Sequence, residues 1–598
     1  MTDSDKIVRI GCASGFWGDS SIAAAQLVER GGIDYLVFDY LAELTMAILA
    51  SARRRKPELG YATDFVDVAM RSVLPEVARR GIKVVANAGG INPAGCAEAL
   101  ARLAKDMGVA LKIAVVEGDD VSGMIPSLRE ADQRDMFTGA PLPEPILSAN
   151  AYLGALPVAR ALSMGADVVI TGRCVDSAVT LGPLMHEFGW GAGDYDLLAA
   201  GSLAGHIIEC GCQATGGLHT DWERVPDWAN IGYPIVECHR DGRFVVTKPE
   251  ATGGLVTAAG VAEQLLYEIG DPAAYVLPDV VCDFRAVRVE QVGENRVEVS
   301  GARGLPPTDR YKVSATYMDG YRSAGTLVII GIDAAAKARR TGEAIIERTR
   351  AMFARLGLPD YSATRVEAIG AEDIYGPHAR TSQVREVTMR VVVNHPMKEA
   401  LEIFAREIAP AGTSWAPGTT APGFVRPSPS PLIKQFAFTL PKDRVDIRVT
   451  LDGHSERVRV PTEGGYRPRS ELEAEVPPPG GPTVTVPLVK LAYCRSGDKG
   501  DLSNIGVIAR REEYFPILLA QLTPAAVKAW FAHLVKGDVK RYVLPGIHAC
   551  NFVLAEALDG GGSASMRLDP LGKGMGQMLL DMPVPVPEEM GRRLIGAS

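Results

Sequence analysis

Short apolar runs alternate with amphipathic stretches through the first two hundred residues of the chain. The apolar runs have the length of buried strands, and they lie at 7–10, 35–38, 82–86, 111–116 and 167–170. Between them, apolar residues recur at helical spacing, at 22–29, 41–55, 64–80 and 153–164. Strands joined in this way by helices are parallel. The pattern therefore predicts an α/β lobe with a doubly wound, mostly parallel sheet.

The remaining chain divides at one segment rich in proline and glycine. Before it, strand-like alternation at 276–302 and 310–333, a helix at 334–357 and a strand near 386–394 predict a second α/β or α+β lobe. After it, strands and helices follow in an order that suits a small α+β sandwich. The predicted units are a domain at 1–475 with possible sub-lobes 1–200 and 201–475, a linker at 476–482, and a small domain at 483–598.

Polar and glycine-bearing loops follow four of the predicted strands. In doubly wound sheets the ligand crevice lies outside the carboxyl ends of the strands, so we expect these loops to meet there. The candidate ligand-binding residues are Ser14, Gly15, Phe16, Trp17, Gly18, Asp39, Asn87, Gly89, Gly90, Thr171 and Gly172.

The first loop, 11–20, has glycines with the spacing GxxxGxxG, which is not the dinucleotide fingerprint GxGxxG. Glycines before a helix favour a bound anion, and Asp39 has the position of an acid that holds a ribose hydroxyl. The alternative is that Asp19 or Ser20 caps the helix and Asp39 caps the next one. Phe16 and Trp17 favour a functional loop, because two large aromatics there need something to pack on.

Three charged residues at strand ends are candidates for catalysis. Asp19 or Asp176 suits a general base, and Arg173 suits a clamp for a carboxylate, phosphate or oxyanion. The alternative for Arg173 is a structural salt bridge. Hydride transfer of the short-chain dehydrogenase type is disfavoured, since Tyr152 is followed four residues later by leucine instead of lysine.

A second candidate region lies in the small domain, where Arg495–Asp501 carries two cations, two acids and two glycines. We interpret it as a loop that binds an anion through Arg495, Ser496, Asp498 and Lys499, and we expect it to reach the crevice of the large domain, in the same chain or across an oligomer interface. Lys573 lies between two glycines, but its spacing does not place it.

The cysteines favour neither a metal site nor a disulfide framework. Cys210 and Cys212 form CxC without a second pair, so we predict no metal site. Cys174, Cys212 and Cys494 are possible thiol nucleophiles, but a small buried apolar residue is the favoured interpretation of each. Nine cysteines without framework spacing indicate a reducing cytoplasm.

Composition narrows the function further. The chain has 598 residues, a formal net charge of −9 and 47% hydrophobic residues, which indicates several globular domains and argues against nucleic-acid or anionic-membrane partners. The polar start is not a secretory signal, and no apolar run reaches the length of a membrane span.

The motifs together resemble the acyclic terpene utilisation AtuA family. The matching segments are Gly15–Asp19, Ala86–Gly90, Thr171–Asp176, Glu209–Gly211 with Thr215–Gly217, and Arg495–Asp501. The resemblance implies a large AtuA domain, a small domain of ferredoxin-like fold, and a place in the catabolism of terpenoid or other branched acids carried as coenzyme A thioesters. One departure is Ala214, where the family pattern has cysteine, and it weakens a thiol nucleophile in that loop.

The leading hypothesis is a cytoplasmic enzyme, expected to be a homo-oligomer, that acts on an acyl-CoA or related branched organic acid. Its chemistry would be hydration, a lyase reaction or hydrolysis, without a tightly bound cofactor, so the CoA moiety would belong to the substrate. The alternative is a non-catalytic subunit that binds an acyl-CoA or a nucleotide in a carboxylase-type assembly.

Overall fold

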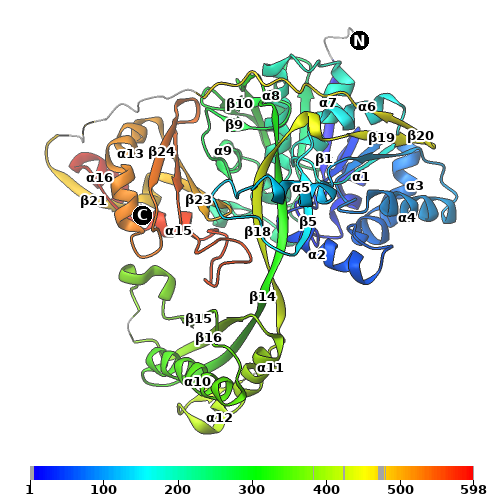
Figure 1. Ribbon diagram of the computed structural model, residues 1–598. Helices are drawn as coiled ribbons and strands as arrows, with labels where there is room; N and C mark the ends of the chain where they lie inside the picture. The colour runs from blue at the N-terminus through cyan, green and yellow to red at the C-terminus, as the bar shows by residue number, and fades with distance from the viewer. Residues whose placement is uncertain (1–5, 382, 422–424, 469–476, 478–479, 597–598) are drawn as a thin grey trace.

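The computed structural model describes residues 6–381, 383–421, 425–468, 477 and 480–596. An eleven-stranded sheet runs through the larger part of it (Figure 1), in the order β11-β12-β8-β7-β1-β2-β3-β6-β4-β19-β20. Its five central strands, β1 to β4 and β6, are parallel, whereas antiparallel strands extend it on both sides. The strands are β1 Ile7–Cys12, β2 Tyr35–Phe38, β3 Lys83–Ala86, β4 Ile113–Glu117, β6 Val168–Thr171, β7 Ile235–His239, β8 Phe244–Thr247, β11 Arg288–Gly293, β12 Arg296–Ser300, β19 Arg448–Leu451 and β20 His454–Arg457.

Helices cover both faces of the parallel strands. Strand β2 alternates between two cores: Tyr35 and Val37 pack with α6, α7 and α8, whereas Leu36 and Phe38 pack with α1, α3 and α4. Burial on both faces explains why these strands read as continuous apolar runs. The helices of this part are α1 Ala23–Arg30, α2 Glu43–Arg55, α3 Arg71–Arg80, α4 Pro93–Asp106, α5 Ile125–Glu130, α6 Leu156–Ser163, α7 Ala178–Phe188, α8 Tyr195–Ile208 and α9 Ala258–Leu266.

A middle lobe is joined to this part by β14, which is 21 residues long (Figure 1). Its far half pairs with β16, and β15 lies beyond β16. The order β-α-β-β-α-β is that of a split βαβ unit. The elements of the lobe are β14 Arg310–Ile330, α10 Ala334–Leu356, β15 Ala363–Ile369, β16 Glu386–His395, α11 Lys398–Glu407, α12 Ala411–Ser414, β17 Thr419–Thr420 and β18 Ser430–Pro441. The first half of β14 pairs with β5 Ile146–Ala151. A separate small sheet is formed by β9 Tyr275–Val276, β10 Val281–Asp283 and β13 Arg303–Leu305.

The structure divides the large domain differently from the sequence-based sub-lobes. The boundary at 200/201 falls inside α8, and six strands after it join the central sheet. Apolar periodicity does not tell which sheet a strand joins, so the sequence could not show this. The mixed α/β class is as predicted.

The small domain has a four-stranded antiparallel sheet in the order β22-β23-β25-β24. The segment Arg495–Asp501 is not a loop: β22 continues to Lys499, and the turn to β23 is made at Gly500 and Asp501. Of the linker predicted at 476–482, positions 476, 478 and 479 lie outside the described residues. The elements are β21 Thr483–Pro487, β22 Ala492–Lys499, β23 Leu502–Ala509, α13 Phe515–Gln521, α14 Pro524–Trp530, β24 Val539–Leu544, β25 Ala549–Leu554, α15 Met575–Leu580, β26 Pro583–Pro587 and α16 Glu588–Ile595. Among the described residues, none of the helices combines the length and the apolar composition that a membrane span requires.

Candidate active site

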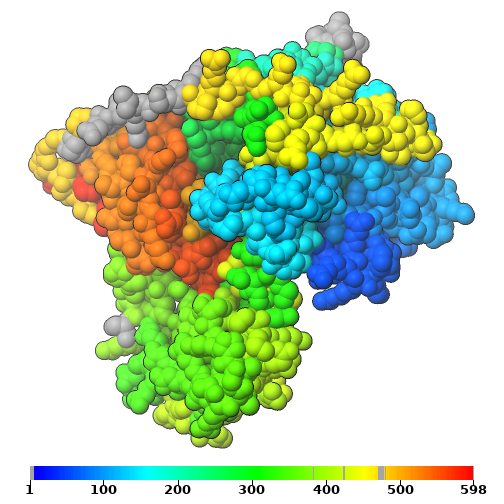
Figure 2. Space-filling view, in the orientation of Figure 1, coloured from blue at the N-terminus to red at the C-terminus, as the bar shows by residue number. Residues whose placement is uncertain are grey.

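A cleft of about 2090 Å³ lies where the large domain, the middle lobe and the small domain meet. The space-filling view shows the blue and cyan N-terminal third of the chain, the green lobe and the orange and red small domain converging there (Figure 2). Its walls include the loops after β1, β2 and β6, the start of α2, the segment after α9, and the end of β22. The cleft thus opens at the carboxyl ends of parallel strands, where such folds bind ligands.

Three acidic side chains and one arginine form the floor of the cleft. Asp39 follows β2, Arg173 and Asp176 follow β6, and Glu209 follows α8. Burial, reinforced by the charge of Asp176, raises the pKa of both Asp39 and Glu209 well above the ordinary carboxyl range. Asn87, at the end of β3, donates a hydrogen bond to Asp39 Oδ1 at 2.5 Å and fixes its orientation. The protonated form of both carboxyl groups is therefore favoured in the cleft relative to a carboxyl group in water.

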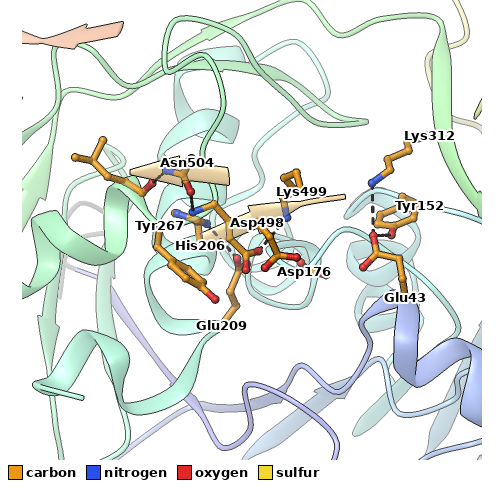
Figure 3. A network of polar contacts seen from close by, with 12 residues as sticks. Glu43, Tyr152, Asp176, His206, Glu209, Tyr267, Lys312, Asp498, Lys499 and Asn504 are labelled. Atoms are coloured by element: carbon orange, nitrogen blue, oxygen red, sulfur yellow. Dashed lines mark hydrogen bonds and ion pairs between the residues drawn. The ribbon is translucent and has the colours of Figure 1, made fainter. Parts of the chain in front are cut away.

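Arg173 is buried and stacks its guanidinium 4.0 Å above the centroid of the Tyr152 ring. Its Nη1 donates to Asp176 Oδ1 at 2.6 Å and to the carbonyl oxygen of Cys174 at 2.5 Å. The Tyr152 hydroxyl in turn donates to Glu43 Oε1 at 2.6 Å, and Lys312 Nζ lies 3.5 Å from the same oxygen (Figure 3). Arg173 thus forms a salt bridge with its neighbouring acid while also lining the cleft.

The small domain contributes a second charged cluster. Glu268, after α9, lies 3.0 Å from both Lys499 Nζ and Lys573 Nζ, and Lys573 Nζ also lies 3.1 Å from Asp498 Oδ1. Although burial opposes ionisation, the two lysines lower the pKa of Glu268 to about 2. Burial and the charge of Glu268 raise the pKa of Asp498 to about 6, against the effect of Lys573. Asp498 is therefore poised to exchange a proton near neutral pH.

Arg495 and Ser496 lie behind the cleft and hold the small domain together and in place. Arg495 Nη1 donates to Gln213 Oε1 at 2.7 Å, and Arg495 Nη2 lies 3.4 Å from Glu263 Oε2, both in the large domain. Ser496 Oγ donates to the carbonyl oxygen of Gly572 at 2.6 Å within the small domain. Of the residues of β22, only the last two, Asp498 and Lys499, line the cleft.

The loop after β1 is held by its own aspartate. Asp19 accepts hydrogen bonds from the amide of Gly15 at 2.9 Å, the amide of Ser20 at 2.7 Å and the hydroxyl of Tyr233 at 2.6 Å. These contacts commit both carboxylate oxygens to the loop. Neither Asp19 nor Ser20 caps α1, whose N-cap residue, Ile22, makes no side-chain cap. Asp19 is thus placed to shape the loop.

The other residues of this loop differ in their access to the cleft. Gly15, Phe16 and Trp17 line it, whereas Ser14 is buried and donates to the carbonyl oxygen of Phe16 at 2.9 Å. A Cβ on Gly15 would lie 2.9 Å from the carbonyl carbon of Cys210, so no side chain fits there. Gly18 does not line the cleft. A side chain would have space there, but the φ of +108° favours glycine, so Gly18 is required by the turn.

The remaining predicted glycines and Thr171 support the cleft from behind. The amide of Gly89 donates to the carbonyl oxygen of buried Thr171 at 3.0 Å, and a Cβ on Gly90 would lie 2.7 Å from the carbonyl oxygen of Gly60. A Cβ on Gly172 would lie 2.2 Å from Asp119 Oδ1. These residues let the loops after β3 and β6 pack closely.

Sequence reasoning missed Glu209, Glu268 and Tyr267 as cleft residues, and it left Lys573 unplaced. Glu209 and Glu268 each follow the end of a strongly apolar helix, a signal that marks a buried acid but does not say what faces it. Cys174 is buried, whereas Cys212 is partly buried and lines the cleft; burial raises the pKa of each thiol to about 12, which disfavours the reactive thiolate.

Comparison with known proteins supplies the family. The model of the acyclic terpene utilisation family protein AtuA matches residues 8–451, and the model of the AtuA ferredoxin-like domain matches residues 486–585. No curated protein and no solved structure matches the chain. The first match spans more than half of the sequence, and the two together follow the large and small domains of the fold. The chain therefore belongs to the acyclic terpene utilisation AtuA family.

Proposed function

We propose that the protein is an enzyme that adds water to, or removes a small group from, a branched organic acid carried as a coenzyme A thioester. The observation that carries this proposal is the meeting, in one cleft, of proton-exchanging carboxyl groups with exposed apolar side chains. Membership of a terpene-utilisation family supports a branched apolar substrate.

Six large apolar side chains that line the cleft are exposed. Exposed large apolar residues are unusual in such number around one cavity, and they favour an apolar ligand. An isoprenoid-like acyl chain has the length and branching to cover them. The residues are Phe16, Leu44, Ile48, Met136, Phe137 and Leu218, each at least 46% exposed.

The size of the cleft also favours a large ligand. Sites for drug-sized molecules occupy about 300–1,000 Å³, and this cleft is about 2090 Å³. A coenzyme A thioester, with its nucleotide, pantetheine arm and acyl group, suits a cavity of this size.

Three charged groups would have separate roles in the reaction, as a base, as a stabiliser of negative charge and as an acid. Asp176, whose side chain is 31% exposed, would act as the base that takes a proton next to the thioester carbonyl. Arg173 would stabilise the negative charge that develops on the carbonyl oxygen. Asp498 would return a proton to the leaving oxygen, which departs as water; in the reverse direction the same groups add water. Asp19, being committed to its loop, would only position the ligand.

The test is turnover by the purified chain with a panel of branched 2-enoyl-CoA and 3-hydroxyacyl-CoA thioesters and their free acids. Mass spectrometry would detect the gain or loss of water, and calorimetry would detect binding. Asp176→Asn should lower turnover by about 10²–10⁴-fold, whereas Asp241→Asn, the same change at an exposed turn, should not. Binding of thioesters without turnover would instead establish a binding subunit, and no binding at all would refute the proposal.

A further inference from the structure

His206 and Glu209 form a buried pair at the end of α8 (Figure 3). His206 Nδ1 lies 3.0 Å from Glu209 Oε1, and His206 Nε2 lies 3.2 Å from the carbonyl oxygen of Leu265. His206 is 2% exposed and Glu209 is 8% exposed, so water does not separate them. The imidazole is therefore held between two fixed partners.

These contacts determine where the protons lie. A carbonyl oxygen can only accept a hydrogen bond, so Nε2 must carry a hydrogen. Nδ1 then faces Oε1 across a single shared proton, either as a neutral imidazole with a carboxylic acid or as an imidazolium with a carboxylate. Both forms have zero net charge, and burial favours the uncharged one. In accord with this, burial lowers the pKa of His206 to about 4 and raises that of Glu209.

The acidic groups around Glu209 raise its pKa in the same direction as burial does. Acids from three separate elements face it, and two cations oppose them without reversing the shift. Tyr275, whose ring lies 5.9 Å from the His206 ring, adds no positive charge. The groups are Asp39, Asp176 and Glu268 on the negative side and Arg173 and Lys499 on the positive side.

The second carboxyl oxygen of Glu209 is available to a ligand. Glu209 lines the cleft, and no hydrogen bond within the described part of the chain reaches its Oε2. Because the shared proton lies on the Oε1 side, Oε2 presents carbonyl character to the cleft. It can accept a hydrogen bond, and it carries no charge that would repel an anionic substrate.

We propose that His206 holds Glu209 as a neutral carboxylic acid and that Glu209 Oε2 accepts a hydrogen bond from a hydroxyl group of the substrate. His206 is then a positioning residue, and Glu209 selects a hydroxyacyl thioester over its deoxy counterpart. The second half of this inference rests on the proposed function, whereas the first half does not.

The protonation state can be tested without a substrate. An infrared difference spectrum between the wild type and Glu209→Gln at pH 7 should show one protonated carboxyl C=O band, and Asp241→Asn should show none. Glutamine has the shape of the neutral acid, so Glu209→Gln should unfold at the same temperature as the wild type at pH 7. His206→Phe should shift the band, because it removes the acceptor. A difference spectrum with carboxylate bands alone, together with a large loss of stability in Glu209→Gln, would overturn the neutral pair.

The selectivity can be tested with 3-hydroxybutyryl-CoA and butyryl-CoA as probes. The wild type should bind the hydroxylated probe about 3–10-fold more tightly, which is the contribution of one neutral hydrogen bond, and Glu209→Leu should lose this preference. An equal preference in both proteins would overturn the acceptor role. If neither probe binds, the acceptor role falls together with the proposed substrate class, and the infrared result still decides the protonation state.

Discussion

Asn504, in β23, is one of the residues that connect the small domain to the segment carrying Glu268. Its Nδ2 donates to the carbonyl oxygen of Leu266 at 2.7 Å, and its Oδ1 accepts from the amide of Glu268 at 2.9 Å. Nδ2 also donates to Asn551 Oδ1 at 2.9 Å. This side chain, 6% exposed, therefore pairs with the backbone that carries Glu268 towards Lys499.

Replacing Asn504 with leucine keeps the volume and removes all three hydrogen bonds. The amide of Glu268 and the Oδ1 of Asn551 then lose the hydrogen bond that the structure gives each of them. Each buried polar group left in this way costs about 1–3 kcal/mol, so the small domain and its contact should lose about 2–6 kcal/mol of stability. The carbonyl of Leu266 adds less, since it also accepts from the amide of Ile269.

Hydrogen exchange of the segment 266–270 measures this effect locally, and urea denaturation measures it for the domain. The exchange should accelerate in Asn504→Leu, and the unfolding transition should move to lower urea. Asn230→Leu is the matched control, because Asn230 makes one long side-chain contact of 3.4 Å at the surface. Unchanged exchange at 266–270 together with an unchanged transition would refute the docking role of Asn504.

Two further predictions concern the loop after β6. Arg173→Lys keeps the charge but loses the planar fork, so affinity for the bound thioester should fall by about 1–3 kcal/mol in calorimetry; wild-type affinity and turnover would reduce Arg173 to a structural salt bridge. Asp119, which accepts from the amide of Arg173 at 2.8 Å, has its pKa raised to about 7 by burial, against an unfolded value of about 3.9. From about pH 4 to pH 7 the folded protein keeps a proton on Asp119 that the unfolded chain has released, so the free energy of unfolding should fall as pH rises. Asp119→Asn should reduce this dependence of the unfolding free energy on pH, as measured by denaturant titrations. A slope that persists in the variant would assign the titration to another group.

The residues at the floor of the cleft could be predicted from the sequence, because their position depends on where apolar strands end. Asp39 and Arg173 each follow an apolar run that could only be a buried strand, and parallel strands bring their carboxyl ends to one edge. The same reasoning could not assign roles at that edge. Asp19 and Asp176 look alike in sequence, yet one is committed to its loop and the other is open to the cleft.

The hairpin of the small domain escaped prediction for a different physical reason. Charges and glycines between two apolar runs are typical of a loop, but here Gly497 and Gly506 belong to adjacent strands, β22 and β23. A Cβ on Gly506 would lie 2.5 Å from the Cβ of Leu266, and one on Gly497 would lie 2.9 Å from the ring of Tyr267. The glycines therefore admit another segment and do not form a turn. Such an approach depends on residues more than two hundred positions away, which local pattern does not encode.

This packing makes the small domain part of the site and not an appendage to it. Glu268 belongs to the large domain, yet both cations that stabilise its charge, Lys499 and Lys573, come from the small domain. Without the two lysines, burial would destabilise the charged form of Glu268 with no cation nearby to offset it. The pKa of Glu268 would then rise from about 2 to above that of a carboxyl group in water. The same separation would deprive the cleft of Asp498, whose pKa of about 6 depends on Glu268 and Lys573. The electrostatic state of the cleft is thus set across the domain contact, so any movement of the small domain would change which carboxyl groups hold protons.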